Sequence, residues 1–283
     1  PKRVRRVEIP KVNGEMRPLG IPTIWDRIIQ QCFLQVLEPI CEAKFFERSN
    51  GFRPNRSVEN AIAQSYKMMQ MYKLHYVVDV DIKGFFDNVN HGKLLKQLWA
   101  IGIRDKRVIA MISKMLKAEV VMPDKSIVKS EKGILKKRLN LEISEDKSKI
   151  TNLRKEYSEF LGFKMKVYQK GDKWKVKSHM CDKAYDRTRK ELKEAMDVIK
   201  DTEGSANTGR AISIYNAKVI GIHQYFQLAT MISEDVSKIS YEIQHKCKSR
   251  KLERRIEQTG RTKQGYIEKI YGASKQLRYI NEV

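Results

Sequence analysis

A seven-residue segment, Tyr76–Ile82 (YVVDVDI), constrains the fold more than any other part of the sequence. Its apolar residues alternate with two aspartates, Asp79 and Asp81, and this period-2 pattern is typical of a β-strand with two unlike faces. The two carboxylates therefore share one face of the strand, at a sheet edge or in a cleft. Val78, Val80 and Ile82 occupy the opposite face.

Strand and helix patterns precede this segment. Two short strands, Arg6–Pro10 and Arg17–Ile21, are predicted on either side of an Asn13-Gly14 turn. Thr23, with an aspartate three residues later, predicts the start of a helix. We expect one face of this helix to be buried, made by Ile28, Ile29, Cys32, Phe33, Val36, Leu37 and Ile40.

Further elements follow from the same rules. A second helix is predicted from Ser57 towards Tyr72, and helical periodicity returns between Lys93 and Lys117. A hairpin is expected across Gly171-Asp172. The predicted short strands are Glu119–Met122, Ser126–Val128, Phe160–Tyr168 and Lys173–Lys177.

The composition changes beyond Ser178 to long, basic, amphipathic helices, roughly at 182–200, 209–231 and 234–257. The linker Thr202–Gly209 separates the first of these helices from the second. The sequence therefore predicts an α+β domain over residues 1–177 and a helical domain over residues 178–283.

The charge balance indicates a polyanionic partner. The 283 residues include 57 Lys plus Arg against 34 Asp plus Glu, a formal net charge of +23. That partner is nucleic acid or an anionic membrane. No apolar run approaches the roughly 18 residues that span a bilayer and the N-terminus lacks a signal-peptide core, so we expect an intracellular protein. Cys32, Cys41, Cys181 and Cys247 are far apart and show no metal-ligand spacing, so we expect reduced thiols.

Four blocks in order carry a family resemblance. They are VEIPK with RPLGIP (Val7–Pro22), GFRPNRS (Gly51–Ser57), VDVDIKGFFDNVNH (Val78–His91) and FLGF (Phe160–Phe163). Together they resemble the reverse transcriptases of group II introns. VIGIHQYFQLAT (Val219–Thr230) and GASKQLRYI (Gly272–Ile280) resemble the same family's thumb or maturase domain. The resemblance implies right-hand fingers and palm followed by a helical thumb.

The resemblance also implies roles for individual residues. Nucleotidyl transfer uses two divalent ions held by carboxylates, and Mg²⁺ is the cofactor implied here. Asp81 matches the first metal ligand, Ile82 a backbone ligand, and Lys147 a proton donor to pyrophosphate. Lys11, Arg17 and Phe86 match residues that hold and select the deoxynucleotide. The segment Phe160, Leu161, Gly162 and Phe163 matches the primer grip.

One departure from the family bears on activity. The PQGG-type block and the YADD turn, which supply the other metal-site aspartates, are absent, and the Gly133–Ile134 junction resembles an excision. Either the polypeptide lacks the segment or the sequence omits residues that the protein has. In the first case the palm is incomplete and polymerisation is expected to be lost, since one aspartate cannot hold two ions in register.

Basic residues are candidates for RNA contact, although a basic face is commonly just solvated. Arg53 and Arg56, in a loop with Asn55, either bind phosphates or cap a turn, and Asp79 and Asp87 are read as structural. The C-terminal candidates are Lys246, Lys248, Arg250, Lys251, Arg254, Arg255, Lys275 and Arg278.

The sequence thus predicts a maturase that binds group II intron RNA and assists splicing, in a bacterial cytoplasm or an organelle. RNA-directed DNA synthesis is expected only if the absent palm segment exists, with a DNA target or primer as a further partner. Two alternatives stay open: a reverse-transcriptase relative in defence or genome maintenance, and a generic basic RNA-binding or chaperone protein.

Overall fold

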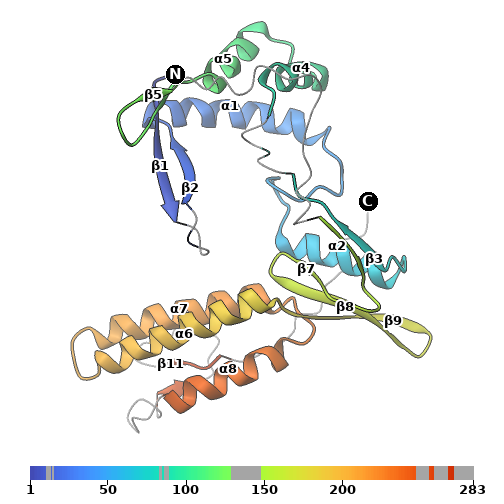
Figure 1. Cartoon of the computed structure of the whole chain (residues 1–283), viewed down its shortest axis with the longest axis vertical. Helices are drawn as coiled ribbons and strands as arrows, with labels where there is room; N and C mark the ends of the chain where they lie inside the picture. The colour runs from blue at the N-terminus through green and yellow to red at the C-terminus, as the bar shows by residue number, and fades with distance from the viewer. Residues whose placement is uncertain are drawn as a thin grey trace. The chain divides into compact units, whose positions relative to one another are not determined.

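The computed structural model describes residues 1–10, 14, 16–82, 85, 89–128, 148–246, 255–257 and 267–270 (Figure 1). By their contacts the residues divide into two units, each built from two stretches of chain. The first unit combines Pro1–Arg53 with Val80–Ser148, and the second combines Pro54–Asp79 with Lys149–Val283.

Among its described residues, the first unit contains a small sheet and three helices. Its elements are β1 (Val4–Pro10), β2 (Met16–Ile21), α1 (Ile24–Glu42), α4 (His91–Ile101), α5 (Lys106–Leu116), β4 (Val120–Val121) and β5 (Ile127–Val128). The strand order is β2-β1-β4-β5, with β1 antiparallel to β2 and parallel to β4. The predicted hairpin is confirmed: Pro10 pairs with Met16, and Gly14 has a φ of +83°, which glycine adopts without strain.

The predicted start of α1 is confirmed at Thr23. Its Oγ1 accepts from the Asp26 backbone N–H at 3.3 Å and donates to the Asp26 carboxylate at 2.7 Å. This hydrogen bond lowers the pKa of Asp26, because it favours the charged form.

The expected burial of one face of α1 is wrong. Asp26 is the only buried residue of the helix, while Ile28, Ile29, Val36 and Ile40 are between 42% and 67% exposed. The physical reason is that none of the elements described for this part of the chain packs extensively against α1. Periodicity reports an apolar face, but it does not supply the partner that covers it.

The helical periodicity between Lys93 and Lys117 corresponds to two helices, α4 and α5. Gly102, with a φ of +126°, ends α4, and its N–H bonds to the Trp99 carbonyl at 3.2 Å. Asp105 caps α5 by accepting from the Arg107 N–H at 2.7 Å.

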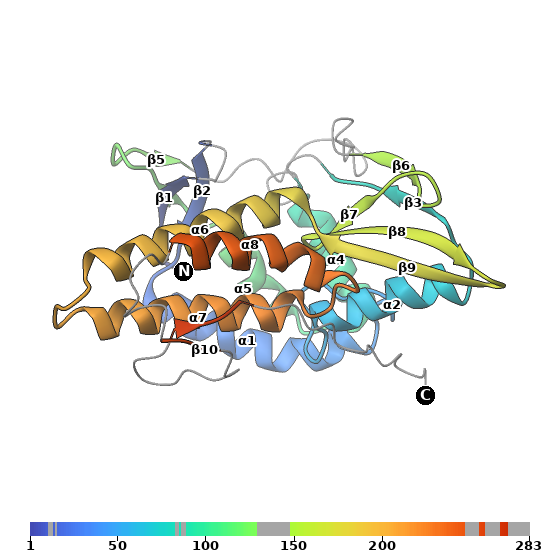
Figure 2. The same ribbon diagram turned by 90° about the horizontal axis from the view of Figure 1, so that it is seen from below.

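The second unit contains three small sheets and four helices among its described residues. Its elements are α2 (Val58–Gln70), β3 (Tyr76–Asp79), β6 (Lys149–Asn152), β7 (Ser158–Phe160), β8 (Phe163–Lys170), β9 (Lys173–Met180), α6 (Asp182–Asp201), α7 (Thr208–Phe226), α8 (Ile232–Lys246), β10 (Ile256–Glu257) and β11 (Ile267–Glu268). The sheets are β3-β6, β7-β8-β9 and β10-β11. Helices α6, α7 and α8 run side by side in both ribbon views (Figures 1 and 2).

Most local predictions for this unit are confirmed. Ser57 caps α2, and the hairpin across Gly171-Asp172 joins β8 to β9 through the Lys170–Lys173 pair. The helix predicted over 234–257 is too long, because α8 ends at Lys246 and Ile256 lies in a strand that pairs with Ile267. The two paired strands are separated in the sequence, and helical periodicity within one segment cannot predict such a pairing.

The core of the second unit lies where α2 and the three long helices meet one face of the β8–β9 hairpin. Val167 and Val176, paired across the hairpin, are 1% and 4% exposed. Other core residues come from every layer: Ile62, Tyr66, Leu153, Phe163, Met165, Met180, Leu192, Met196, Ile212, Tyr215, Val219, Ile239 and Ile243.

Two further expectations meet the structure here. Cys32, Cys41 and Cys181 are free thiols, and Cys247 lies outside the described residues. Among the residues that the structure describes, no helix is long and apolar enough to cross a membrane.

Candidate functional site

The strand that carries the predicted acidic face is shorter than expected. β3 pairs antiparallel with β6, from Tyr76–Asn152 to Asp79–Lys149. The Asp79 carboxylate accepts a hydrogen bond of 3.3 Å from Ser158 Oγ, which agrees with a structural role. Asp81 lies beyond the strand end and is exposed, and its backbone N–H donates to Ser148 Oγ at 3.4 Å.

The residues that the structure describes do not assemble the two-ion site that the resemblance implies. Asp81 and Ile82 are the matched ligands in the described chain, and no group of three His, Cys, Asp or Glu residues that could hold a metal occurs among the residues described. One exposed carboxylate binds a divalent ion weakly, because such ions take several oxygen ligands from protein and substrate. No catalytic step through a metal is therefore derived for this chain.

A cavity of about 310 Å³ lies between α2, β3 and the β7–β8 sheet. Its mostly apolar wall includes three methionines, Met68 and Met69 from α2 and Met165 from β8. Asp79 and Ser158 supply its polar side. Flexible thioether side chains adapt to an apolar group of variable shape.

The predicted primer-grip segment forms a tight turn between β7 and β8. Phe160 pairs with Phe163, and the two residues between them both have positive φ, +50° at Leu161 and +81° at Gly162. This is the geometry of a type I′ turn, in which a leucine is strained and a glycine is not. Phe163 is fully buried, so the turn offers Phe160 and Leu161, 39% and 40% exposed, to a ligand.

Contacts from outside the turn hold its backbone. The Cys181 N–H donates to the Gly162 carbonyl at 2.8 Å, and the Tyr225 hydroxyl donates to the Leu161 carbonyl at 2.9 Å. The Tyr225 ring stacks on Phe163 with centroids 5.6 Å apart. Burial raises the pKa of Tyr225, so its hydroxyl stays protonated and able to donate at neutral pH.

A groove of about 520 Å³ begins at this turn and runs between α6 and α7. Its lining includes the small residues Ala184, Ala217 and Gly221 and three charged side chains, Arg187, Glu191 and Lys218. Arg187 pairs with Glu191 at 4.0 Å, so the groove carries charges of both signs.

The predicted basic residues occupy different environments. Arg17 is exposed on β2. Arg53 is committed to its own loop: its side chain is 6% exposed, Nε donates to Glu42 at 2.9 Å, and it also donates to the Phe46 carbonyl at 2.7 Å. The hydrogen bonds to Glu42 raise the pKa of Arg53. These contacts favour the turn-capping role over phosphate binding.

Asn55 is exposed with a φ of +56°, and Arg56 and Arg255 are half-buried. Many predicted residues lie outside the described part of the chain. They are Lys11, Phe86, Asp87, Lys147, Lys248, Arg250, Lys251, Arg254, Lys275 and Arg278, together with the Lys246 side chain and the Gly133–Ile134 junction.

One basic surface of the second unit, the outer face of the β8–β9 hairpin, is not among the predicted RNA-contact residues. Its residues are Lys164, Lys166, Tyr168, Lys170, Lys173, Lys175, Lys177 and His179. The available signal was lysine at alternate positions in both strands, which a period-2 reading places on one face. We call this surface the lysine face.

Comparison with known proteins shows which family and which relatives this chain is similar to. Residues 9–136 match the family described as reverse transcriptase (RNA-dependent DNA polymerase). The chain is 41% identical over 122 residues to protein YkfC of Escherichia coli, covering 42% of this chain and 32% of that protein. It is 41% identical over 119 residues to the group II intron-encoded protein LtrA of Lactococcus lactis, covering 42% of this chain and 19% of LtrA.

A plant protein extends the comparison. The chain is 34% identical over 113 residues to nuclear intron maturase 2, mitochondrial, of Arabidopsis thaliana, covering 40% of this chain and 15% of that protein. The matched part is thus less than a third of the length of each of these relatives. The resemblance read from the sequence is confirmed over residues 9–136, and the α+β class with a reverse-transcriptase fingers and palm region and a helical region is confirmed. The FLGF block and the two blocks that resemble a thumb or maturase domain lie outside the matched residues and stay predictions.

Proposed function

We propose that this chain, whose residues 9–136 match the reverse transcriptase family and which is similar to a group II intron-encoded protein, binds structured intron RNA and assists its splicing. The observation that carries the proposal is the match to proteins named as intron-encoded or as intron maturases. The formal charge of +23 supports it, since RNA is the polyanion that such a scaffold would meet. Cytoplasmic or organellar localisation belongs to the same proposal.

The domain division is also part of the proposal. Residues 1–177 would supply fingers and palm, and residues 178–283 a thumb or maturase domain whose helices α6, α7 and α8 flank the primer-grip turn. Tyr225 on α7 contacts Leu161 of that turn, which supports a shared nucleic-acid surface across the division.

Filter binding of the full chain to a group II intron RNA tests this function, with an unstructured RNA of equal length as the matched control. The expected result is tighter binding to the intron and faster splicing when protein is added. Equal affinity for both RNAs would favour a generic RNA-binding protein. Binding without any splicing effect would favour a reverse-transcriptase relative outside introns.

RNA-directed DNA synthesis is a second candidate, favoured by the family match. We propose it, with Mg²⁺ and a DNA primer or target, only for a polypeptide that supplies the carboxylates absent beside Asp81. Lys147 and the deoxynucleotide contacts Lys11, Arg17 and Phe86 belong to this second proposal. Primer extension on an RNA template measures it, and Asp81→Ala should abolish extension while RNA binding persists. Extension that survives Asp81→Ala would refute the role of Asp81.

A further inference from the structure

The lysine face is produced by the register of one hairpin. Lys166 pairs with Lys177, Tyr168 with Lys175, and Lys170 with Lys173. The intervening residues, such as Val167 and Val176, point to the core, so the hairpin is apolar on one side and basic on the other. Along each strand the ammonium groups follow one another at roughly 7 Å, twice the rise per residue.

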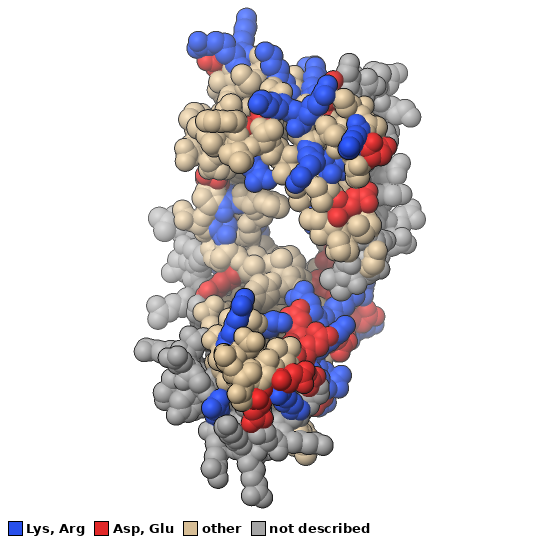
Figure 3. Space-filling model, turned by 90° about the vertical axis from the view of Figure 1, so that its left-hand side faces the viewer, with Lys and Arg blue, Asp and Glu red and all other residues tan. Residues whose placement is uncertain are grey.

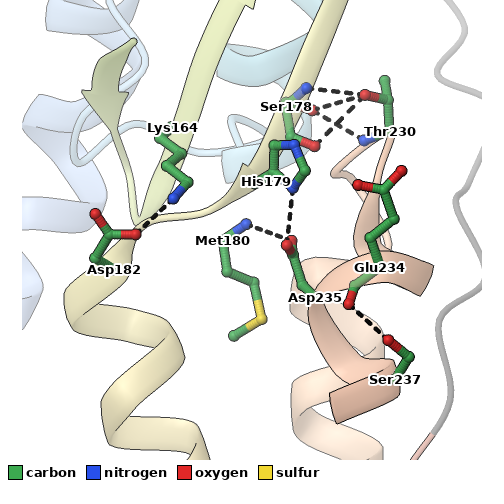
Figure 4. Close-up of polar contacts among 9 residues, drawn as sticks. All are labelled: Lys164, Ser178, His179, Met180, Asp182, Thr230, Glu234, Asp235 and Ser237. Atoms are coloured by element: carbon green, nitrogen blue, oxygen red, sulfur yellow. Dashed lines mark hydrogen bonds and ion pairs between the residues drawn. The ribbon is translucent and has the colours of Figure 1, made fainter. Parts of the chain in front are cut away.

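Among the described residues, the carboxylates that pair with this face lie at the end far from the hairpin turn, beside Lys164 and His179. Lys164 forms an ion pair of 2.5 Å with Asp182, the first residue of α6 (Figure 4), and this raises the pKa of Lys164. Lys166 donates to the Lys155 carbonyl at 2.8 Å, an interaction that leaves its charge in place. In the described part of the chain, no carboxylate forms an ion pair with Lys170, Lys173, Lys175 or Lys177.

The basic helices of the same unit behave differently. Lys190 pairs with Glu194 at 3.9 Å, Arg187 pairs with Glu191, and Arg189 pairs with Glu242 at 2.8 Å. Acidic side chains accordingly lie among the basic ones on the helical part, in the lower half of Figure 3. A basic composition alone therefore does not explain the lysine face.

The facing lysines lower the stability of the folded protein when no ligand is bound. Like charges directly opposite one another on an antiparallel pair are destabilising, and the hairpin contains two such pairs, Lys166–Lys177 and Lys170–Lys173. Protection of an exposed strand edge by lysine applies to β9, which ends its sheet, and also to Lys166 and Lys170 of β8, because β7 pairs only with Phe163–Met165. Edge protection does not require lysines to stand directly opposite one another, as they do in the two cross-strand pairs.

Aromatic rings accompany the charges. The ammonium groups of Lys164 and Lys166 lie 5.8 and 5.7 Å from the centre of the Tyr157 ring. Tyr168 is 45% exposed and sits between Lys166 and Lys170 on its strand. Lysines with interleaved exposed tyrosines are the combination that binds a phosphate backbone and stacks on its bases or sugars.

We propose that the lysine face is a docking surface for the phosphate backbone of RNA, with Lys170, Lys173, Lys175 and Lys177 as its main contacts. The inference rests on the proposed function and names a surface for it. Phosphate contact would remove the cross-strand repulsion, and such contacts respond to RNA shape and charge rather than to base sequence.

A charge-matched pair of double variants tests this surface. Lys173→Ala with Lys175→Ala removes two lysines of the face, while Lys183→Ala with Lys190→Ala removes two exposed lysines of α6. Binding of the full chain to intron RNA is measured from 50 to 400 mM KCl. The first variant should weaken binding at 100 mM salt on the order of tenfold or more and lower the log–log salt slope by about two. The second should leave both close to wild type.

The outcomes separate the two proposals. Failure of the wild-type chain to bind RNA would overturn the proposed function. Wild-type binding with equal losses in both double variants would overturn the lysine face alone. Co-sedimentation with phosphatidylserine vesicles is the third measurement. If the face variant loses binding to vesicles but keeps wild-type binding to RNA, the surface binds a membrane and the RNA proposal is refuted. Thermal melting, expected to be unchanged or improved, confirms that the face variant is folded.

Discussion

The hydroxyl of Tyr225 on α7 donates a 2.9 Å hydrogen bond to the carbonyl of Leu161, a leucine held in the left-handed region at φ +50°. Because a Cβ atom is disfavoured there and glycine has none, Leu161→Gly should be more stable than Leu161→Ala by about 1 kcal/mol. Urea unfolding measures the difference. At Tyr168, in ordinary strand conformation, glycine should be the less stable of the two.

Tyr225→Phe removes the hydroxyl and keeps the ring on Phe163. Since Tyr225 is partly exposed, we expect a loss near the lower end of the range for one hydrogen bond, about 0.5 kcal/mol. The loss should shrink in the Leu161→Gly background, because a glycine turn needs less restraint. A double-mutant cycle measures this coupling, and a coupling energy of zero would show that Tyr225 does not stabilise the strained turn.

His75 gives the second unit a pH-dependent stability. It is 3% exposed, Nε2 lies 3.2 Å from the Met69 carbonyl, and Nδ1 accepts from Arg154 Nε at 2.8 Å. Burial, and then the charge of Arg154, lower the pKa of His75. The unfolded chain therefore binds a proton more readily than the folded one, so the stabilisation is present above about pH 6.5 and is lost as the pH falls below it.

His75→Gln isolates this effect. The difference in unfolding free energy between wild type and variant should become smaller from pH 7.5 to pH 5.5. Tryptophan fluorescence can monitor unfolding, because the ring of Trp174 lies 4.3 Å from that of His75. A difference that stays constant over this range would mean that His75 does not titrate between the folded and unfolded states as proposed.

Asp235 fastens the start of α8 to the end of β9 (Figure 4). Its carboxylate bonds to His179 Nδ1 at 2.8 Å and accepts from the Met180 N–H at 2.8 Å, with both side chains 12% exposed. Asp235→Ala should cost about 2–3 kcal/mol of unfolding free energy, because two poorly hydrated groups lose their partner. Glu234→Ala, one residue earlier and exposed, is the matched control and should cost less than 0.5 kcal/mol.

Arg53→Lys tests which of two roles the loop arginine has. A lysine cannot reproduce the forked contacts to Glu42 and to the carbonyls of Phe46 and Ser49, so the first unit should melt at a lower temperature. RNA affinity measured below that temperature should be unchanged. Reduced affinity at unchanged melting temperature would instead assign Arg53 to phosphate binding.

Local chemistry made much of this fold predictable. Thr23 and Ser57 each cap the helix they were expected to start, and Gly14 and Gly171-Asp172 lie at the two hairpin turns. These signals act within a few residues, so the sequence contains all the information they require.

Nonlocal relationships were less predictable. The apolar face of α1 is exposed because burial depends on a partner that periodicity does not name, and Ile256 is in a strand because of Ile267. The primer-grip string was recognised as a motif, but its anchor on Tyr225 joins residues 64 positions apart in the chain. The lysine face needed the register of β8 on β9 before its charges could be placed together.

Lys166 and Val167 are neighbours in sequence, yet one side chain belongs to the basic surface and the other to the core. If the lysine face binds RNA as proposed, folding and RNA affinity are thermodynamically linked through the same two strands. A ligand that binds the lysine face will raise the melting temperature of the protein. A core substitution that opens a cavity at Val176 will lower the affinity for that ligand. In this hairpin, the residues that stabilise the core and the residues of the basic surface alternate along one short stretch of sequence.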